Sequence, residues 1–152
     1  MDRFLFRYFL TYPDREQEIG ILRSVDEPSE ATADPLGTDN ILKIREMVSH
    51  VHVTTEIMEY MVGIIRETRE NRKIYLGASP RTTAKMLKAA KANALVNGRD
   101  YVIPEDVKYI TNEMLNHRLI MNSEAIIEAG SQVNKAIEKI IEESVEKVRT
   151  PV

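Results

Sequence analysis

The sequence contains no cysteine, which excludes a disulfide scaffold, a thiolate zinc site and a cysteine nucleophile. None of its six glycines is followed by lysine, so a phosphate-binding loop of the form GxxxxGK(S/T) cannot occur. It also has no long apolar run, and its first seven residues are too charged for a signal peptide. We therefore expect a soluble, cytoplasmic protein that has no phosphate-binding loop of its own for a nucleoside triphosphate.

The composition is that of a folded protein. Of 152 residues, 43% are hydrophobic and 30% are charged, which favours one globular domain over a disordered chain. The formal net charge of −3 gives no general attraction to polyanions. We expect neither nucleic acid nor a membrane among the partners.

Helical periodicity dominates the chain. Apolar residues on one face predict helices over residues 14–25, 38–49, 54–71, 80–97, 104–116 and 123–148. Ser79 and Pro80 mark a helix start, Gly98 marks a left-handed helix end, and Gly130 a break. Brief extended pieces are expected at 51–53 and 101–103. The predicted fold class is mainly α, a small helical bundle with two or three very short strands.

The N-terminal segment, residues 4–12, is rich in aromatic and apolar side chains and predicts a strand buried on at least one face. Pro13 opens a helix at once, so no hairpin partner follows. The sheet of this strand would then belong to a preceding domain absent from this sequence. We expect residues 4–10 to stay outside any full sheet, folded back on the bundle, frayed, or paired with another copy.

A basic stripe is the strongest local signal. Residues 81–99 contain five basic side chains and no acid, and Arg81, Lys85 and Lys88 share one helix face. Arg81 falls in the first turn, where free backbone N–H groups and the helix dipole favour an anion. A cationic side chain is unfavourable at this end of an isolated helix, so its presence suggests that Arg81 binds an anion. The alternative is a solvated face balanced by acids such as Glu105 and Asp106.

Other chemical signals are weak. His50 and His52 alternate without a third ligand nearby, so no metal site is expected. His117 and Arg118 follow a helix end, where cations are favourable, and are interpreted as structural. Five methionines on helical faces are interpreted as core residues, namely Met47, Met58, Met61, Met86 and Met114.

Several strings together resemble the helical lid of MoxR-type AAA+ ATPases. They are LGASPR (76–81), AAKA (89–92), GRDYV (98–102), PEDV (104–107) and NHR (116–118). DRF (2–4) and YPDREQE (12–18) resemble the passage from that family's ATPase core into its lid. The resemblance covers nearly the whole chain and lacks only the upstream core with its Walker motifs.

The resemblance implies specific roles. Arg81 corresponds to the sensor 2 arginine, which reaches the γ-phosphate of the nucleotide, and Arg3 to the arginine finger, which acts on the neighbouring subunit's nucleotide. A guanidinium suits both, because phosphoryl transfer spreads charge over several oxygens. The family usually has an arginine near Lys88 or Lys91, so no role is assigned to those lysines or to Lys85.

The resemblance also implies an organisation and partners. Residues 1–12 would be the last strand of an absent AAA+ core, 13–37 a connecting helix and acidic linker, and 38–152 the lid domain. The complete protein would use ATP and Mg, form a hexameric ring through core and neighbouring subunits, and remodel or mature an unidentified client in a chaperone-like way. This chain alone would be inactive.

Two other functions compete with this interpretation. One is a stand-alone helical interaction module that descends from such a lid and has no ATPase role. The other is a DNA-binding helical domain that uses residues 81–99, which the acidic total disfavours.

Overall fold

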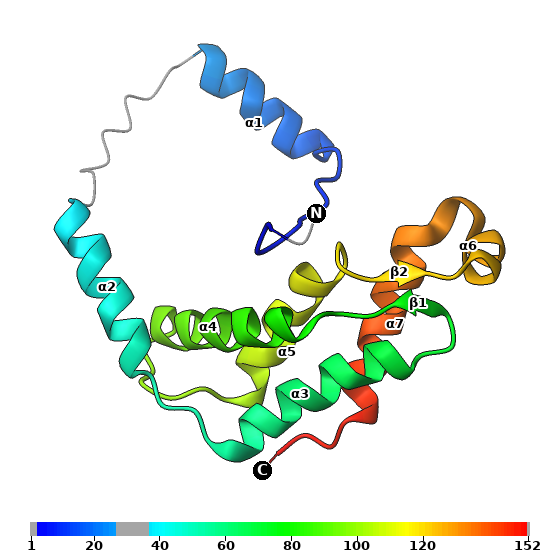
Figure 1. Cartoon of the computed structure of the whole chain (residues 1–152). Coiled ribbons are helices and arrows are strands. Elements are labelled where there is room, and N and C mark those ends of the chain that lie inside the picture. Colours follow the sequence, from blue (N-terminus) through cyan, green and yellow to red (C-terminus); the bar gives the residue numbers. More distant parts are fainter. Residues whose placement is uncertain (1–2, 27–36, 152) are drawn as a thin grey trace.

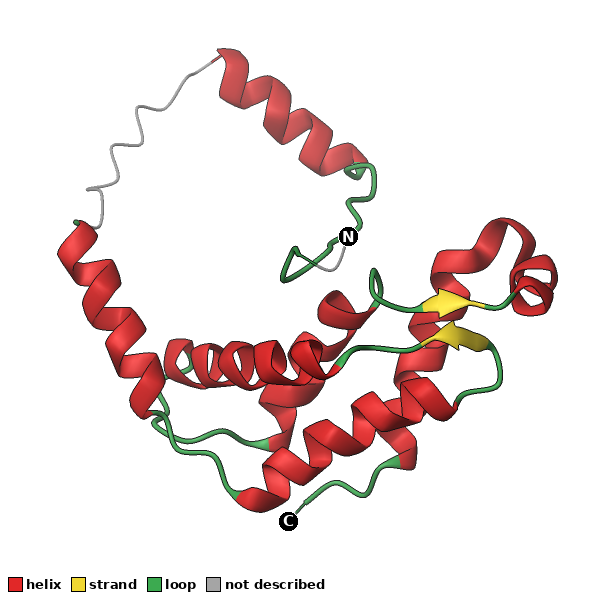
Figure 2. Cartoon of the chain, viewed as in Figure 1, coloured by secondary structure: helices red, strands yellow, loops and turns green. Residues whose placement is uncertain are grey.

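The computed structural model describes residues 3–26 and 37–151, and most of them are helical (Figure 1) (Figure 2). The elements in chain order are α1 (Arg15–Asp26), α2 (Thr38–His50), α3 (Thr55–Glu70), β1 (Ile74–Leu76), α4 (Pro80–Val96), α5 (Pro104–Leu115), β2 (Ile120–Met121), α6 (Ser123–Ala129), η1 (Gly130–Gln132) and α7 (Val133–Lys147). The predicted class, a mainly α bundle with very short strands, is confirmed. Within the expected linker, residues 27–36 lie outside the described residues.

Helix boundaries follow local signals. The Thr54 hydroxyl caps α3 by accepting the Ile57 N–H at 3.4 Å. Pro80 occupies the first position of α4, where its missing N–H costs nothing. Gly98 has a φ of +73°, which a side chain would strain, so it ends the helix as expected. Gly130, with a φ of +54°, separates α6 from the helical turn before α7.

The core lies where α3, α4, α5 and α7 cross (Figure 1). The most deeply buried side chains include Tyr60, Met61, Ile64, Ile65, Met86, Met114, Leu115 and Ile141. The expectation for methionine is therefore right for Met61, Met86 and Met114. It is wrong for Met47 and Met58, which are 54% and 43% exposed because no described element covers those faces.

The strands differ from those expected. β1 and β2 pair antiparallel, with Ile74 opposite Met121 and Leu76 opposite Ile120. Their sequences are too short to show a period of two, so no pattern predicted them.

The pieces expected to be extended, 51–53 and 101–103, meet in one isolated parallel bridge between His52 and Tyr101. The His52 N–H donates to the Asp100 carbonyl at 2.7 Å, and the Val102 N–H donates to the His52 carbonyl at 3.0 Å. This bridge ties the loop before α3 to the loop before α5.

α1 and α2 lie outside the bundle (Figure 1) and bury no residue within the described chain. The apolar face expected for the helix over residues 14–25 is not buried, since Leu22 is 69% exposed and Ile19 is only half-buried. The apolar side of α2 is exposed in the same way, at Ile41, Leu42 and Ile44. Both helices are amphipathic, and although α2 packs against α4 near Val48, the described chain leaves most of the apolar side of each helix uncovered.

The N-terminal segment is not a strand, which corrects the sequence prediction. Residues 6–12 have no regular secondary structure, and Phe4 and Tyr8 are 72% and 64% exposed. Without a neighbouring strand, its backbone bonds to the end of α5 and the turn after it. The expectation that residues 4–10 stay outside any full sheet and fold back on the bundle is confirmed.

Candidate functional site

Arg81 lies in the first turn of α4 and is exposed, as expected. Its turn is fixed by the Thr82 N–H, which donates to the Ser79 carbonyl at 2.9 Å, and by the two hydroxyls, which are 3.3 Å apart. Within residues 3–26 and 37–151, no carboxylate forms an ion pair with Arg81. The guanidinium is thus held at a positive helix end and is available to an anion.

The rest of the basic stripe has a different environment. Lys85 and Lys88 line an apolar groove of about 490 Å³ that Phe6 and Tyr8 of the N-terminal segment help to form. Lys91 donates to the Ser49 carbonyl at 3.1 Å. The structure therefore does not present the lysines and Arg81 as one uniform anion surface.

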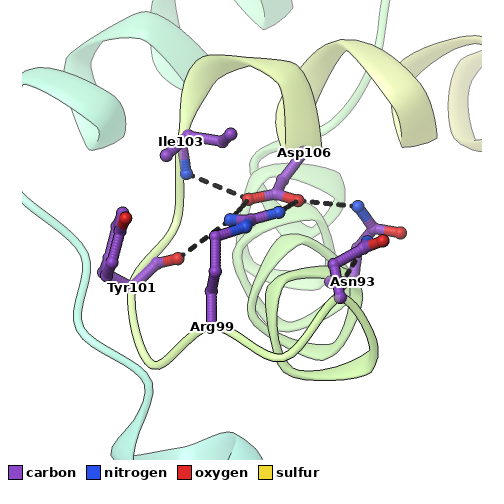
Figure 3. Close-up of polar contacts among 6 residues, drawn as sticks. Asn93, Arg99, Tyr101, Ile103 and Asp106 are labelled. Atoms are coloured by element: carbon purple, nitrogen blue, oxygen red, sulfur yellow. Dashed lines mark hydrogen bonds and ion pairs between the residues drawn. The ribbon is translucent and has the colours of Figure 1, made fainter.

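The acid expected to balance the stripe, Asp106, is occupied elsewhere. Its carboxylate is almost fully buried and accepts a hydrogen bond from each terminal nitrogen of Arg99, both at 2.6 Å (Figure 3). It also accepts the Asn93 amide at 2.7 Å and the Ile103 N–H at 3.0 Å. This side chain fastens the loop between α4 and α5 to both helices.

The electrostatics of this pair follow from its bonds. Burial by itself raises the pKa of Asp106, but hydrogen bonds from Arg99, Ile103 and Asn93 outweigh it, so the pKa lies below its ordinary value. The bond to Asp106 raises the pKa of Arg99. The pair stays charged at neutral pH and is structural.

A cavity of about 750 Å³ opens beside the start of α4. Arg69, Ser79, His117 and Arg118 contribute basic and polar groups to its wall. The Arg69 side chain donates to the Ala78 carbonyl at 2.7 Å, which fixes the approach to α4. The turn that carries Arg81 therefore borders the turn after α5.

Asn116, His117 and Arg118, which we call the 116–118 clamp, hold the N-terminal segment. Arg118 is 7% exposed, and its guanidinium donates to the carbonyls of Leu5, at 3.1 Å, and of Phe4. His117 Nε2 lies 3.2 Å from the Phe4 carbonyl oxygen. Sequence reasoning interpreted His117 and Arg118 as structural but did not predict this clamp, because its partners lie 113 and 114 residues away in sequence.

Arg3 is exposed in the turn immediately before these clamped carbonyls. Its own role rests on resemblance. What the structure adds is that the backbone following Arg3 is tied to Arg118, 113 and 114 residues away in sequence.

Residues 3–26 and 37–151 contain neither a metal-binding cluster nor a membrane-spanning helix. No group of three or more His, Cys, Asp or Glu side chains could hold a metal ion. No helix combines the length and apolar character needed to cross a bilayer.

Comparison with known proteins identifies the family. The AAA lid domain family matches residues 66–144, just over half of the chain. The chain belongs to this family. Its matched part begins within α3 and ends within α7, so it includes the start of α4 and the 116–118 clamp.

Individual proteins similar to this chain support the assignment to the AAA lid family. Uncharacterized protein YeaC of Bacillus subtilis is 34% identical over all of this chain and 47% of its own length. Chaperone MoxR1 of Mycobacterium tuberculosis is 30% identical over 91% of this chain and 40% of its own. A crystal structure of a proposed ATPase from Cytophaga hutchinsonii superposes with a TM-score of 0.88 at 31% identity, covering 99% of this chain and 48% of that one.

The chain thus spans about half the length of the relatives it matches. Together they identify it as a lid region of the MoxR-type AAA+ proteins.

Proposed function

We propose that this lid couples ATP binding and hydrolysis in the complete protein to chaperone-like remodelling or maturation of partner proteins. In this proposal Arg81 is the sensor 2 residue, and Arg3 is the arginine finger for a neighbouring subunit in a hexameric ring. ATP and Mg bind the AAA+ core, which this chain does not contain. The chain itself supplies two guanidinium groups, one at the start of α4 and one in the turn at Arg3.

The observation that carries the proposal is the setting of Arg81. A sensor must reach a phosphate on another domain, so its own bundle must leave the guanidinium unsatisfied. Arg81 is exposed, sits at the positive end of a 17-residue helix and has no carboxylate within ion-pair distance in the described chain.

The uncovered apolar sides of α1 and α2 support the partner assigned here. Both helices expose groups of large apolar side chains, which the surface of a monomeric protein rarely does. These are Ile21, Leu22 and Val25 on α1 and Ile41 and Leu42 on α2. We assign them to contact with the AAA+ core, with residues 1–12 as its continuation, 13–37 as the connection and 38–152 as the lid domain.

The test is Arg81→Ala in the complete protein, with ATP turnover and melting temperature measured side by side. Loss of a charge-stabilising arginine at a phosphoryl-transfer site lowers turnover on the order of 10³-fold or more. An exposed substitution changes stability by only about 0.5 kcal/mol. We expect a large loss of turnover with an almost unchanged melting temperature.

Arg72→Ala is the matched control, because Arg72 is an exposed arginine in the turn between α3 and β1. It should change neither quantity. Unchanged turnover in Arg81→Ala together with a large fall in melting temperature would assign Arg81 a structural role and reject the proposal.

A further inference from the structure

We infer that the 116–118 clamp positions the arginine finger, so that Arg118 and Asn116 act through Arg3 on the nucleotide of the neighbouring subunit. This inference rests on the proposed role of Arg3. It adds positioning residues that belong to the lid, and it makes the lid the element that sets where the finger lies.

The first support is the chemistry of Arg118. A buried guanidinium needs several acceptors, and Arg118 finds them in backbone carbonyls of the N-terminal segment and of α5. It donates to Met114 of α5, which orients the side chain, and to Phe4 and Leu5, which directly follow Arg3. These bonds hold the backbone one and two residues from the finger.

The second support is a reciprocal set of bonds between Asn116 and Arg7. The Asn116 amide donates to the Arg7 carbonyl at 3.0 Å, and Arg7 Nε donates to the Asn116 side-chain oxygen at 3.1 Å. The other guanidinium end of Arg7 donates to the Asn116 carbonyl at 2.8 Å. The Arg7 N–H donates to the Glu113 carbonyl at 2.9 Å. The segment is thus fastened at two points, residues 4–5 and residue 7.

The third support is the neighbourhood of the clamp. His117 and Arg118 line the same cavity as Ser79 and Pro80, which begin α4 and precede Arg81. α4 and α5 also pack against each other in the core. Arg81 and the backbone beside Arg3 are therefore both attached to the packed pair of α4 and α5. A movement of the lid that follows the phosphate contact of Arg81 would then also move Arg3.

The test uses the complete protein and a double-mutant cycle of Arg3→Ala and Arg118→Met. If Arg118 acts through Arg3, Arg118→Met alone lowers kcat by about 10- to 100-fold, as expected for a displaced catalytic group, with KM for ATP little changed. In the Arg3→Ala background, it lowers kcat by less than about twofold, because the finger is already gone.

A subunit-mixing experiment separates this role from a local effect on the same subunit's site. Arg118→Met subunits are mixed with subunits whose only change removes the phosphate-loop lysine of the core. Random mixing in a ring pairs an intact site with an intact finger at about a quarter of the interfaces, so turnover returns to that level. Mixing Arg118→Met with Arg3→Ala subunits leaves no intact finger and restores nothing.

Because Arg118 is buried, Arg7→Met provides a second variant, which removes the two side-chain bonds from Arg7 to Asn116. Size-exclusion chromatography and melting temperature establish that each variant folds and assembles, and Arg72→Met is the control. We expect Arg7→Met to lower kcat and to show the same loss of effect in the Arg3→Ala background.

The outcomes are distinguishable. If Arg3→Ala keeps full turnover, the proposed function of Arg3 fails. If Arg3→Ala is impaired while assembled Arg118→Met or Arg7→Met protein keeps full turnover, the positioning inference alone is overturned. Equal losses from Arg118→Met with and without Arg3 also overturn it, because they place its action elsewhere.

Discussion

The Asp106 carboxylate accepts hydrogen bonds from both terminal nitrogens of the Arg99 guanidinium, each at 2.6 Å. This pair spans the loop that joins the end of α4 to the start of α5. Asp106 is 1% exposed, whereas the Arg99 side chain is 22% exposed. The buried member of this pair has its charge satisfied from one side by Arg99 and from the other by Asn93. The junction of α4 and α5 therefore depends on an ionised carboxylate.

We predict that Asp106 makes the bundle sensitive to acid. Its pKa is lowered in the folded chain, so its contribution to stability is present above its unfolded pKa of about 3.9 and is lost as the pH falls through the folded value. Asp106→Asn should cost roughly 3 kcal/mol at pH 7, since it leaves a guanidinium without its buried partner. Denaturant unfolding at pH 7 and pH 3 should show wild type and variant converging in acid.

Glu124→Gln serves as the control for this experiment. Glu124 is an exposed acid in the first turn of α6. Its substitution should change stability by about 0.5 kcal/mol or less. A gap between wild type and Asp106→Asn that stays constant down to pH 3 would contradict the prediction.

We predict that Gly77→Ala destabilises the lid. A Cβ on Gly77 would lie 2.8 Å from Cα and 2.9 Å from N of Arg69, and these backbone atoms cannot move aside as a side chain does. Overpacking of this kind costs about 1–3 kcal/mol and displaces the approach to α4. Gly20→Ala is the matched control, because nothing lies within 4 Å of its Cβ and alanine favours the helix by up to about 1 kcal/mol. Thermal unfolding that ranks the two variants in the opposite order would reject this account.

We predict that this chain alone does not bind ATP tightly. No glycine is followed by lysine, so the loop that cradles a triphosphate is absent from these 152 residues, and Arg81 by itself gives one charged contact. Isothermal titration of the chain with ATP should give no saturation in the micromolar range. A micromolar Kd would require a nucleotide site formed by the lid itself, which would contradict the proposal that ATP binds the AAA+ core.

We predict two levels of backbone protection in hydrogen exchange. α1 and α2 bury no residue, so their opening is opposed by local hydrogen bonds and, for α2, by the packing of its end against α4, where Lys91 bonds to Ser49, whereas α3 is anchored by Ile64 and Ile65 in the core. Amides of α1 and α2 in the isolated chain should exchange much faster than those of α3. Equal protection would mean that a second copy covers the apolar faces of α1 and α2.

Much of the fold could be predicted because helix signals are local. The Ser79–Pro80 start, the Gly98 end and the break at Gly130 each depend on residues within one turn, and all three were predicted correctly. The exposure of Arg81 was predictable for the same reason, since it needed only the position of the first turn. Its role as a sensor stays a prediction.

The remainder depends on contacts between distant parts of the chain. β1 and β2 are defined by pairing across more than forty residues, and neither segment is long enough to show alternation. The N-terminal segment has the composition of a strand, but a strand needs a neighbour, and the bonds it makes instead come from Asn116 and Arg118. Asp106 was expected as an acid that could balance the basic stripe, and its burial depends on how the loop between α4 and α5 brings it to Arg99 and Asn93.

The distribution of sulfur in the bundle gives the chain an internal reporter. Met61, Met86 and Met114 are at most 1% exposed at the crossing of the core helices, whereas Met47 and Met58 face solvent. Dilute peroxide converts an accessible thioether to a polar sulfoxide, so the two outer methionines should oxidise at once. Met61, Met86 and Met114 can react only when the helices part, and with no cysteine to compete, the rate at which the peptides that contain them gain mass measures how often the bundle opens.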